Sequence, residues 1–230
     1  MERSLAGDRA GFTGPGDPER IEVRNILVMM DYLPPAPGDA FLHDWDLVVL
    51  HHPPVVNPSV PCYVIHSSWD IIEGGACDAL ADCLGVLPDG VLDESTGLGR
   101  VGKVRSGPVP LARFIREALV GLRLDDIRIV NFQPDRMVEK VGLISGFGLE
   151  PRFIRKAYDR GVDLYLSGDL THRGALLAKT LGLALADAPH HATEVPGLYR
   201  LAELLRATGV EVTVQDRGVP WKTIHRCNGF

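Results

Sequence analysis

The chain has 230 residues, of which 45% are hydrophobic and 23% charged, proportions that suit a folded protein with one large domain or two small lobes. Its formal net charge of −6 gives no electrostatic case for nucleic-acid binding. No apolar run approaches the roughly 18 residues that a membrane span requires, so we expect neither a nucleic-acid nor a membrane partner.

The amino-terminal residues 1–19 are polar and glycine-rich, without the apolar core of a secretory signal. The cysteines form no CxxC pair and no zinc-finger spacing. We therefore expect a cytoplasmic protein in which the thiols are reduced and mostly buried. The four cysteines are Cys62, Cys77, Cys83 and Cys227.

Strand-like apolar runs alternate with helix-like segments along the chain, which predicts an α/β fold with substantial parallel sheet. Several of the expected helices are followed by a glycine, as is common where helices end. A turn-rich stretch, 93–110, separates two halves of the chain. Strands are expected at 26–30, 47–50, 62–65, 127–130, 141–144, 164–166, 183–186 and 210–214, and helices at 75–84, 111–120, 151–160, 171–181 and 197–207.

The segment from Gly97 to Gly102 matches the dinucleotide-binding pattern GxGxxG. However, no strand is expected directly before it and no helix directly after it, and a dinucleotide site needs both. We interpret the glycines as a structural turn. The phosphate-binding pattern GxxxxGK[ST] is absent from the sequence.

Four histidines form two adjacent pairs that are far apart in the sequence. His51 and His52 follow an apolar run and precede two prolines, and His190 and His191 follow another apolar run, with Glu194 close behind. Ligands in open α/β sheets bind beyond the carboxyl ends of strands, and histidine is the commonest metal ligand. The two pairs therefore predict one shared metal centre.

Two further strand ends add to this pattern. His66 and Asp70 follow the run 62–65, and Asp169 and His172 follow the run 164–166. Mixed nitrogen and carboxylate ligands favour zinc, iron or manganese, and a glutamate that bridges two ions is common in two-metal hydrolases.

Each of these residues, taken alone, also suits a structural role. A lone histidine at a strand end is commonly hydrogen-bonded rather than a ligand, and Asp70 and Asp169 suit helix caps. Because proline is tolerated in a first helical turn, we expect the helix that contains Pro196 to begin near residue 192 or 193. His43 and His225 stand outside the pattern and are expected on the surface.

The motifs resemble those of the Nif-three-like family, also known as GTP cyclohydrolase I type 2-like dinuclear metal proteins. The resemblance extends over nearly the whole chain and looks especially like archaeal methanogen members. It rests on five segments: His51-His52-Pro53, His66 to Asp70 with the following Gly74-Gly75, Gly97 to Gly102, Ser167 to His172, and Asp187 to Glu194.

The resemblance implies a two-lobed α/β fold with mixed, largely parallel sheets flanked by helices, with lobes of about 1–96 plus 183–230 and 97–182. It implies two divalent metal ions and a homo-oligomer, a hexamer in the family. It places His66 and Asp169 around the ligands, and His172 and His191 in the pocket as candidate proton carriers. The implied ligands are His51, His52, Asp70, His190 and Glu194.

Three functions remain open at this point. The first is a metal-dependent hydrolase acting on a nucleotide or another phosphate ester. The second is an iron-trafficking or chaperone protein that passes metal to an acceptor protein, since some methanogen members of the resembled family are linked to assembly of an iron–guanylylpyridinol cofactor. The third is a regulatory or interaction protein whose metal pair is structural.

Overall fold

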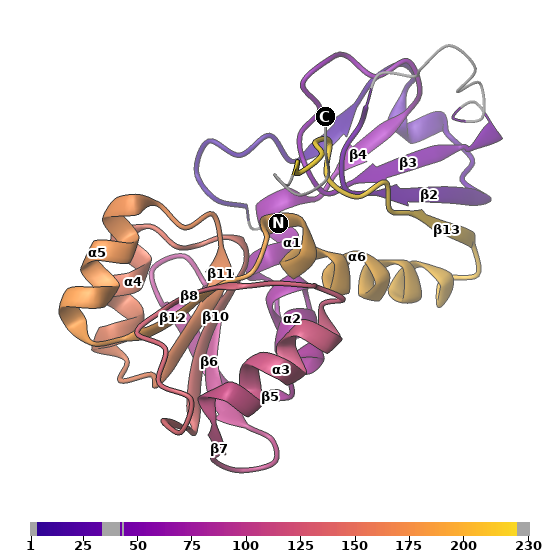
Figure 1. Cartoon of the computed structure of the whole chain (residues 1–230). Coiled ribbons are helices and arrows are strands. Elements are labelled where there is room, and N and C mark those ends of the chain that lie inside the picture. The colour runs from indigo at the N-terminus through magenta and orange to yellow at the C-terminus, as the bar shows by residue number, and fades with distance from the viewer. Residues whose placement is uncertain (1–3, 34–41, 43, 225–230) are drawn as a thin grey trace.

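The protein has two lobes, and each contains one main β-sheet (Figure 1). The computed structural model describes residues 4–33, 42 and 44–224. The expectations for His43, His225 and Cys227 lie outside these residues. The other three cysteines are free thiols, and Cys62 and Cys77 are buried. No helix in the described part of the chain is long and apolar enough to cross a membrane.

The first sheet has the strand order β1-β4-β3-β2-β13 and is largely parallel, since only β1 runs antiparallel to its neighbour. Successive side chains of a strand point to opposite faces. Val28 accordingly packs with Trp69 and Leu198 on one face, while Met29 packs on the other. The strands are β1 (Gly11–Thr13), β2 (Asn25–Met29), β3 (Leu47–Leu50), β4 (Cys62–Val64) and β13 (Glu211–Gln215).

The second sheet has the order β5-β6-β10-β11-β12-β8 and is mixed, because only the pairs β10–β11 and β11–β12 are parallel. A short antiparallel pair, β7 with β9, lies apart from it. The strands are β5 (Val86–Asp93), β6 (Leu98–Val104), β7 (Val109–Pro110), β8 (Arg128–Val130), β9 (Met137–Val138), β10 (Lys140–Phe147), β11 (Leu164–Gly168) and β12 (Ala184–Asp187).

Helices cover both faces of the second sheet, with α4 and α5 on one side and α2 and α3 on the other, while α1 and α6 lie between the lobes (Figure 1). A short 3-10 helix spans Pro18–Arg20. The helices are α1 (His66–Ile71), α2 (Ala76–Cys83), α3 (Leu111–Gly121), α4 (Pro151–Asp159), α5 (His172–Leu181) and α6 (His190–Arg206). The prediction of an α/β fold with mixed sheets flanked by helices is confirmed, and the first sheet is the largely parallel one.

The glycine segment after residue 97 is a strand, β6, and not the expected turn. It lies between β5 and β10, where a Cβ on Gly102 would come within 2.1 Å of the Leu87 carbonyl oxygen and one on Gly99 within 2.7 Å of the Ile144 side chain. The glycines are needed because backbones approach closely here. The second sheet also takes in β5 and β12, which the expected division at residues 97 and 183 assigned to the first lobe.

Helix α6 begins at His190, earlier than the start expected from Pro196, which lies inside the helix. An interior proline removes one helical hydrogen bond and costs about 3 kcal/mol or more. Contacts with β10 hold the early turns in place: Gly146 N donates to Thr193 Oγ1 at 2.8 Å, and Ser145 Oγ donates to the Thr193 carbonyl at 3.1 Å. This start is what brings His190 and Glu194 onto one helix face.

Candidate metal centre

The carboxyl ends of parallel strands from both sheets meet between the lobes. His51 and His52 follow β3, and their backbone N–H groups continue the ladder by donating to the carbonyls of Met29 and Met30. Asp31 lies just beyond β2 and His66 just beyond β4. From the second sheet, Asp169 follows β11, and β12 leads into the start of α6.

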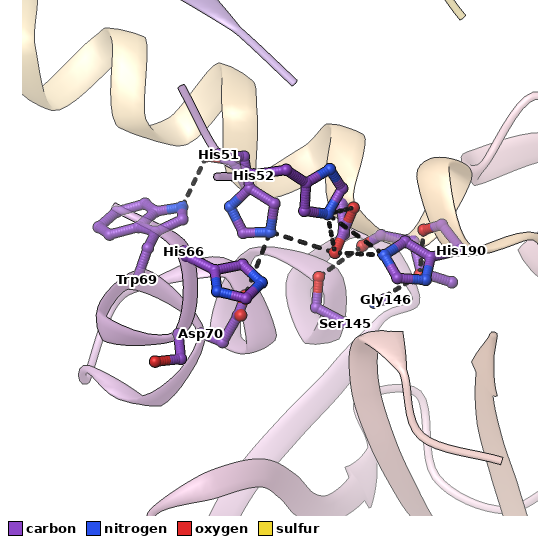
Figure 2. A network of polar contacts seen from close by, with 12 residues as sticks. His51, His52, His66, Trp69, Asp70, Ser145, Gly146 and His190 are labelled. Carbon is purple, nitrogen blue, oxygen red and sulfur yellow. Dashed lines mark hydrogen bonds and ion pairs between the residues drawn. The ribbon is translucent and has the colours of Figure 1, made fainter. Parts of the chain in front are cut away.

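Glu194 is the centre of the cluster. Its side chain is 4% exposed, and its Oε1 lies 3.1 Å from His51 Nε2 and 3.0 Å from His190 Nε2. His52 Nε2 is hydrogen-bonded to Glu194 Oε1 at 3.4 Å and lies 3.2 Å from Oε2, a closer contact that lacks hydrogen-bond geometry. Figure 2 shows the three rings turned toward one point. One buried carboxylate thus faces three imidazoles, two from the end of strand β3 and one from the start of helix α6.

Asp70 extends the cluster on the side of His51, with Oδ1 3.7 Å from His51 Nε2. On the other side, the Nε2 atoms of His52 and His190 lie 3.3 Å apart. The five predicted ligands are therefore gathered in one place. The compact core of the group is His51, His52 and Glu194, whose potential ligand atoms lie within 4.8 Å of one another.

Carboxylates outside this set orient the rings. Asp169 Oδ2 lies 2.6 Å from His190 Nδ1, and Asp31 Oδ1 lies 2.9 Å from His52 Nδ1. A carboxylate on Nδ1 holds the ring so that Nε2 faces the centre, an arrangement common around metal-bound histidines. Asp169 has a φ of +62°, a left-handed backbone that aspartate tolerates better than most residues.

His66 has the same type of partner. Its Nδ1 lies 2.6 Å from Oδ1 of Asp8, and its ring centroid lies 5.8 Å from those of both His51 and His52. The other oxygen of Asp8 accepts hydrogen bonds from the backbone N–H and the hydroxyl of Ser67. His66 therefore borders the cluster, as the resemblance implied.

The proposed proton carriers lie outside the cluster itself, although His191 lines one of the two cavities that border it. His172 is the first residue of α5 and is exposed, and it lines neither of the two cavities that border the cluster. His191 points away from Glu194 and pairs with Asp216, with Nε2 2.8 Å from Oδ1. Adjacent residues on a helix project about 100° apart, which explains why His190 faces the centre while His191 does not.

The charges of the cluster depend strongly on one another. Burial alone would raise the pKa of Glu194, but the surrounding imidazoles, His51 first among them, hold it well below its usual value. Burial would lower the pKa of His52, yet its hydrogen bonds to Asp31 and Glu194 raise it to about 10. Burial raises the pKa of Asp70 to about 6.

Two residues important to this geometry were not among the candidates from the sequence. Asp31 directly follows a predicted strand, so its position at the same sheet edge as His51 and His52 could have identified it. Asp8 lies in the polar amino-terminal segment, where no local pattern marks it.

Gly146 of β10 lies directly against the cluster. It has a φ of +73°, and a Cβ there would come within 2.2 Å of Glu194 Oε1.

Comparison with known proteins gives a consistent picture. Residues 55–218 match the family model described as Duf34/NIF3 (NGG1p interacting factor 3). A GTP cyclohydrolase 1 type 2 homolog from Methanothermobacter thermautotrophicus is 44% identical over 96% of this chain and 88% of its own length. A protein of the same name from Methanocaldococcus jannaschii is 28% identical over 88% of this chain and 87% of its own length.

Solved structures share the fold. Reduced HcgD from Methanocaldococcus jannaschii aligns with a TM-score of 0.77 and 27% identity, covering 93% of this chain and 91% of that one. Staphylococcus aureus hypothetical protein SA1388 aligns with a TM-score of 0.81 and 19% identity, covering 97% and 94% of the two chains. The second likeness is evidence of the fold alone.

Proposed function

The chain belongs to the Duf34/NIF3 family, and from that premise we propose that it holds two divalent metal ions between its lobes and acts as a metal-dependent hydrolase. The observation that carries the proposal is the position of Glu194, a buried carboxylate that faces His51, His52 and His190 at once. Three imidazoles and two carboxylates are a ligand set suited to zinc, iron(II) or manganese.

The residues fit such ions because two buried carboxylate oxygens of the cluster have no hydrogen-bond partner among the described protein atoms. These atoms are Asp70 Oδ1 and Glu194 Oε2. Buried polar atoms of this kind usually have a partner, and an ion is one explanation for an orphan. The facing Nε2 atoms of His52 and His190 suit a shared cation in the same way.

The arrangement favours two ions over one. Asp70 lies beside His51, whereas His190 lies beside His52, so the ligands divide into two groups. Glu194 reaches both groups, which is the role of a bridging carboxylate. Pairs of ions in hydrolases are typically about 3.5–4 Å apart, a separation that one carboxylate can bridge.

A bound metal pair would supply a nucleophile at neutral pH by lowering the pKa of water, and would stabilise charge on the leaving oxygen. The protein itself contributes by orienting the imidazole rings of the ligands. Asp31 and Asp169 accept hydrogen bonds from Nδ1 of His52 and His190, which presents Nε2 of each ring to the centre. As substrate class we propose a nucleotide or another phosphate ester.

The test is to purify the protein anaerobically, measure its metal content, and screen it for hydrolysis of nucleotides and phosphate esters. We expect about two ions per chain, with activity lost on chelation and restored by zinc, manganese or iron(II). Glu194→Ala should lose at least one ion and all activity. Glu203→Ala, an exposed glutamate on the same helix, is the matched control and should retain both. Full metal content in Glu194→Ala would contradict the proposal.

One observation favours a second function, iron trafficking. The side chain of His51 is 3% exposed, whereas those of His52 and His190 are 24% and 29% exposed. An ion on the His52 side would be more accessible and could exchange with an acceptor protein. Metal-loaded protein that is inert toward every ester in the screen, but transfers iron to an apo-acceptor, would favour this function over hydrolysis.

A further inference from the structure

A cavity of about 390 Å³ opens beside the exposed half of the cluster. His52 and His190 line it, so a molecule bound there would lie against the proposed metal centre. Its volume falls within the range of small-molecule binding sites. A second cavity, of about 400 Å³, borders the cluster on the side of Asp70 and is lined partly by the cations Arg152 and Lys156.

The walls of the first cavity are largely apolar. One wall is the Pro53-Pro54 turn that follows the histidine pair, and the other is the segment after β13, which contributes Val219, Pro220 and Trp221. Trp221 remains 63% exposed. A large aromatic surface left open beside a polar centre is typical of a ligand site, because flat rings stack on it.

The polar groups that line this cavity are the three histidines His52, His190 and His191, the Tyr32 hydroxyl and two carboxylates. Asp31 and Asp169 both line it, and each gives one oxygen to its histidine partner. The second oxygen of each can accept a hydrogen bond. These two acceptor oxygens favour a ring that carries N–H donors. Acceptor oxygens between apolar walls match a nitrogen heterocycle.

The segment that forms the second wall is fastened to α6. Asp216 accepts hydrogen bonds from the backbone N–H of Gly218 at 2.9 Å and pairs with His191 Nε2 at 2.8 Å. This pair links the first turn of the helix to the residues that lead into Trp221. His191 itself lines the cavity, and through Asp216 it also holds the segment that forms the second wall.

We propose that this cavity binds a flat nitrogen heterocycle, stacked on Trp221 with its N–H groups toward Asp31 and Asp169, and that the His191–Asp216 pair positions the wall that selects it. The inference rests on the proposed function only in that the ring would belong to the substrate of the neighbouring centre. It makes Trp221 a specificity-determining residue and His191 a positioning residue.

The test measures binding of adenosine, guanosine and ribose by calorimetry, with the full chain both as purified and after chelation. Both nucleosides should bind and ribose should not. Base–aromatic stacking is lost in Trp221→Ala, which should weaken nucleoside binding roughly 5- to 150-fold, while Trp221→Phe should retain most of it. Asp216→Asn should weaken it by up to about 5-fold, as expected for loss of a partly exposed ion pair.

Phe132→Ala is the matched control, since Phe132 is 50% exposed and does not line this cavity. It should bind nucleosides like the unmodified protein. Nucleosides that fail to bind, or that bind Trp221→Ala as tightly as the unmodified chain, would overturn the inference. The metal content of each variant separates this result from the proposed function, because Trp221→Ala should keep its ions and Glu194→Ala should not.

Discussion

Asp31 Oδ1 lies 2.9 Å from Nδ1 of His52 and fixes the direction in which that ring faces. We expect Asp31→Asn to retain the fold and to weaken metal binding roughly 10- to 100-fold, as is typical when a partner of a metal-bound histidine is changed. Competition with a chelator measures the affinity. Asp125→Asn, at an exposed aspartate that lines neither cavity beside the cluster, should leave the affinity unchanged. Equal affinities in the two variants would contradict the role of Asp31.

Gly146 is expected to be required for the position of Glu194. A Cβ on Gly146 would come within 2.2 Å of Glu194 Oε1, whereas one on Gly161, whose φ is similarly +65°, would meet nothing within 4 Å. Both Gly→Ala variants pay the left-handed backbone penalty of about 1–2 kcal/mol. Only Gly146→Ala should also lose metal, as measured by elemental analysis. Loss of metal from Gly161→Ala to the same extent would show that the effect is general strain.

His66 should tune the metal site without being an obligatory ligand. It is held by Asp8 and borders the rings of His51 and His52, but lies outside the group around Glu194. We expect His66→Ala to lower metal affinity by roughly 10- to 100-fold at most, and Glu194→Ala to lower it further. Titrating metal into both variants side by side compares them. A greater loss in His66→Ala would reverse this order.

Without metal, the stability of the protein should fall as pH rises above neutrality. Hydrogen bonds from His190 to Glu194 and Asp169 outweigh burial and raise its pKa from 6.5 to about 9, and that of His52 is raised to about 10. A histidine with a raised pKa binds its proton more tightly in the folded state. Its stabilisation is complete below the unfolded value of 6.5 and is lost as pH rises through the folded value.

Thermal unfolding between pH 6.5 and 9 tests this expectation. In the presence of a chelator, Tm should decline across this range. With zinc bound the decline should be smaller or reversed, because metal ligation needs neutral imidazoles and becomes stronger as pH rises. A Tm that stays constant over the range in the chelated protein would contradict the charge coupling around Glu194.

Much of the fold was predictable because local signals agreed with the tertiary structure. Apolar runs such as the one before His51 are buried strands, and each expected strand and helix occurs with ends shifted by a few residues, apart from the early start of α6. Strand β6 was missed because its glycines resemble turn residues in sequence. They serve close packing between β5 and β10, which only the folded sheet reveals.

The candidate site was predictable to a similar degree. Histidines at the ends of parallel strands were expected to converge, and His51, His52 and His190 do so. The direction of side chains was harder to predict, since it depends on where a helix begins. His172 and His191 are near the right strand ends, but helical geometry turns them away from Glu194. Asp8 joins the site through a contact with His66, 58 positions away in sequence.

Anomalous diffraction from crystals grown with zinc or iron(II) would show whether Glu194 bridges two metal ions, as we propose. We expect two peaks about 3.5–4 Å apart, one on each side of the Glu194 carboxylate. One should lie within ligand distance of His51 and Asp70, and the other within ligand distance of His52 and His190. A single peak, or peaks remote from Glu194, would contradict the account.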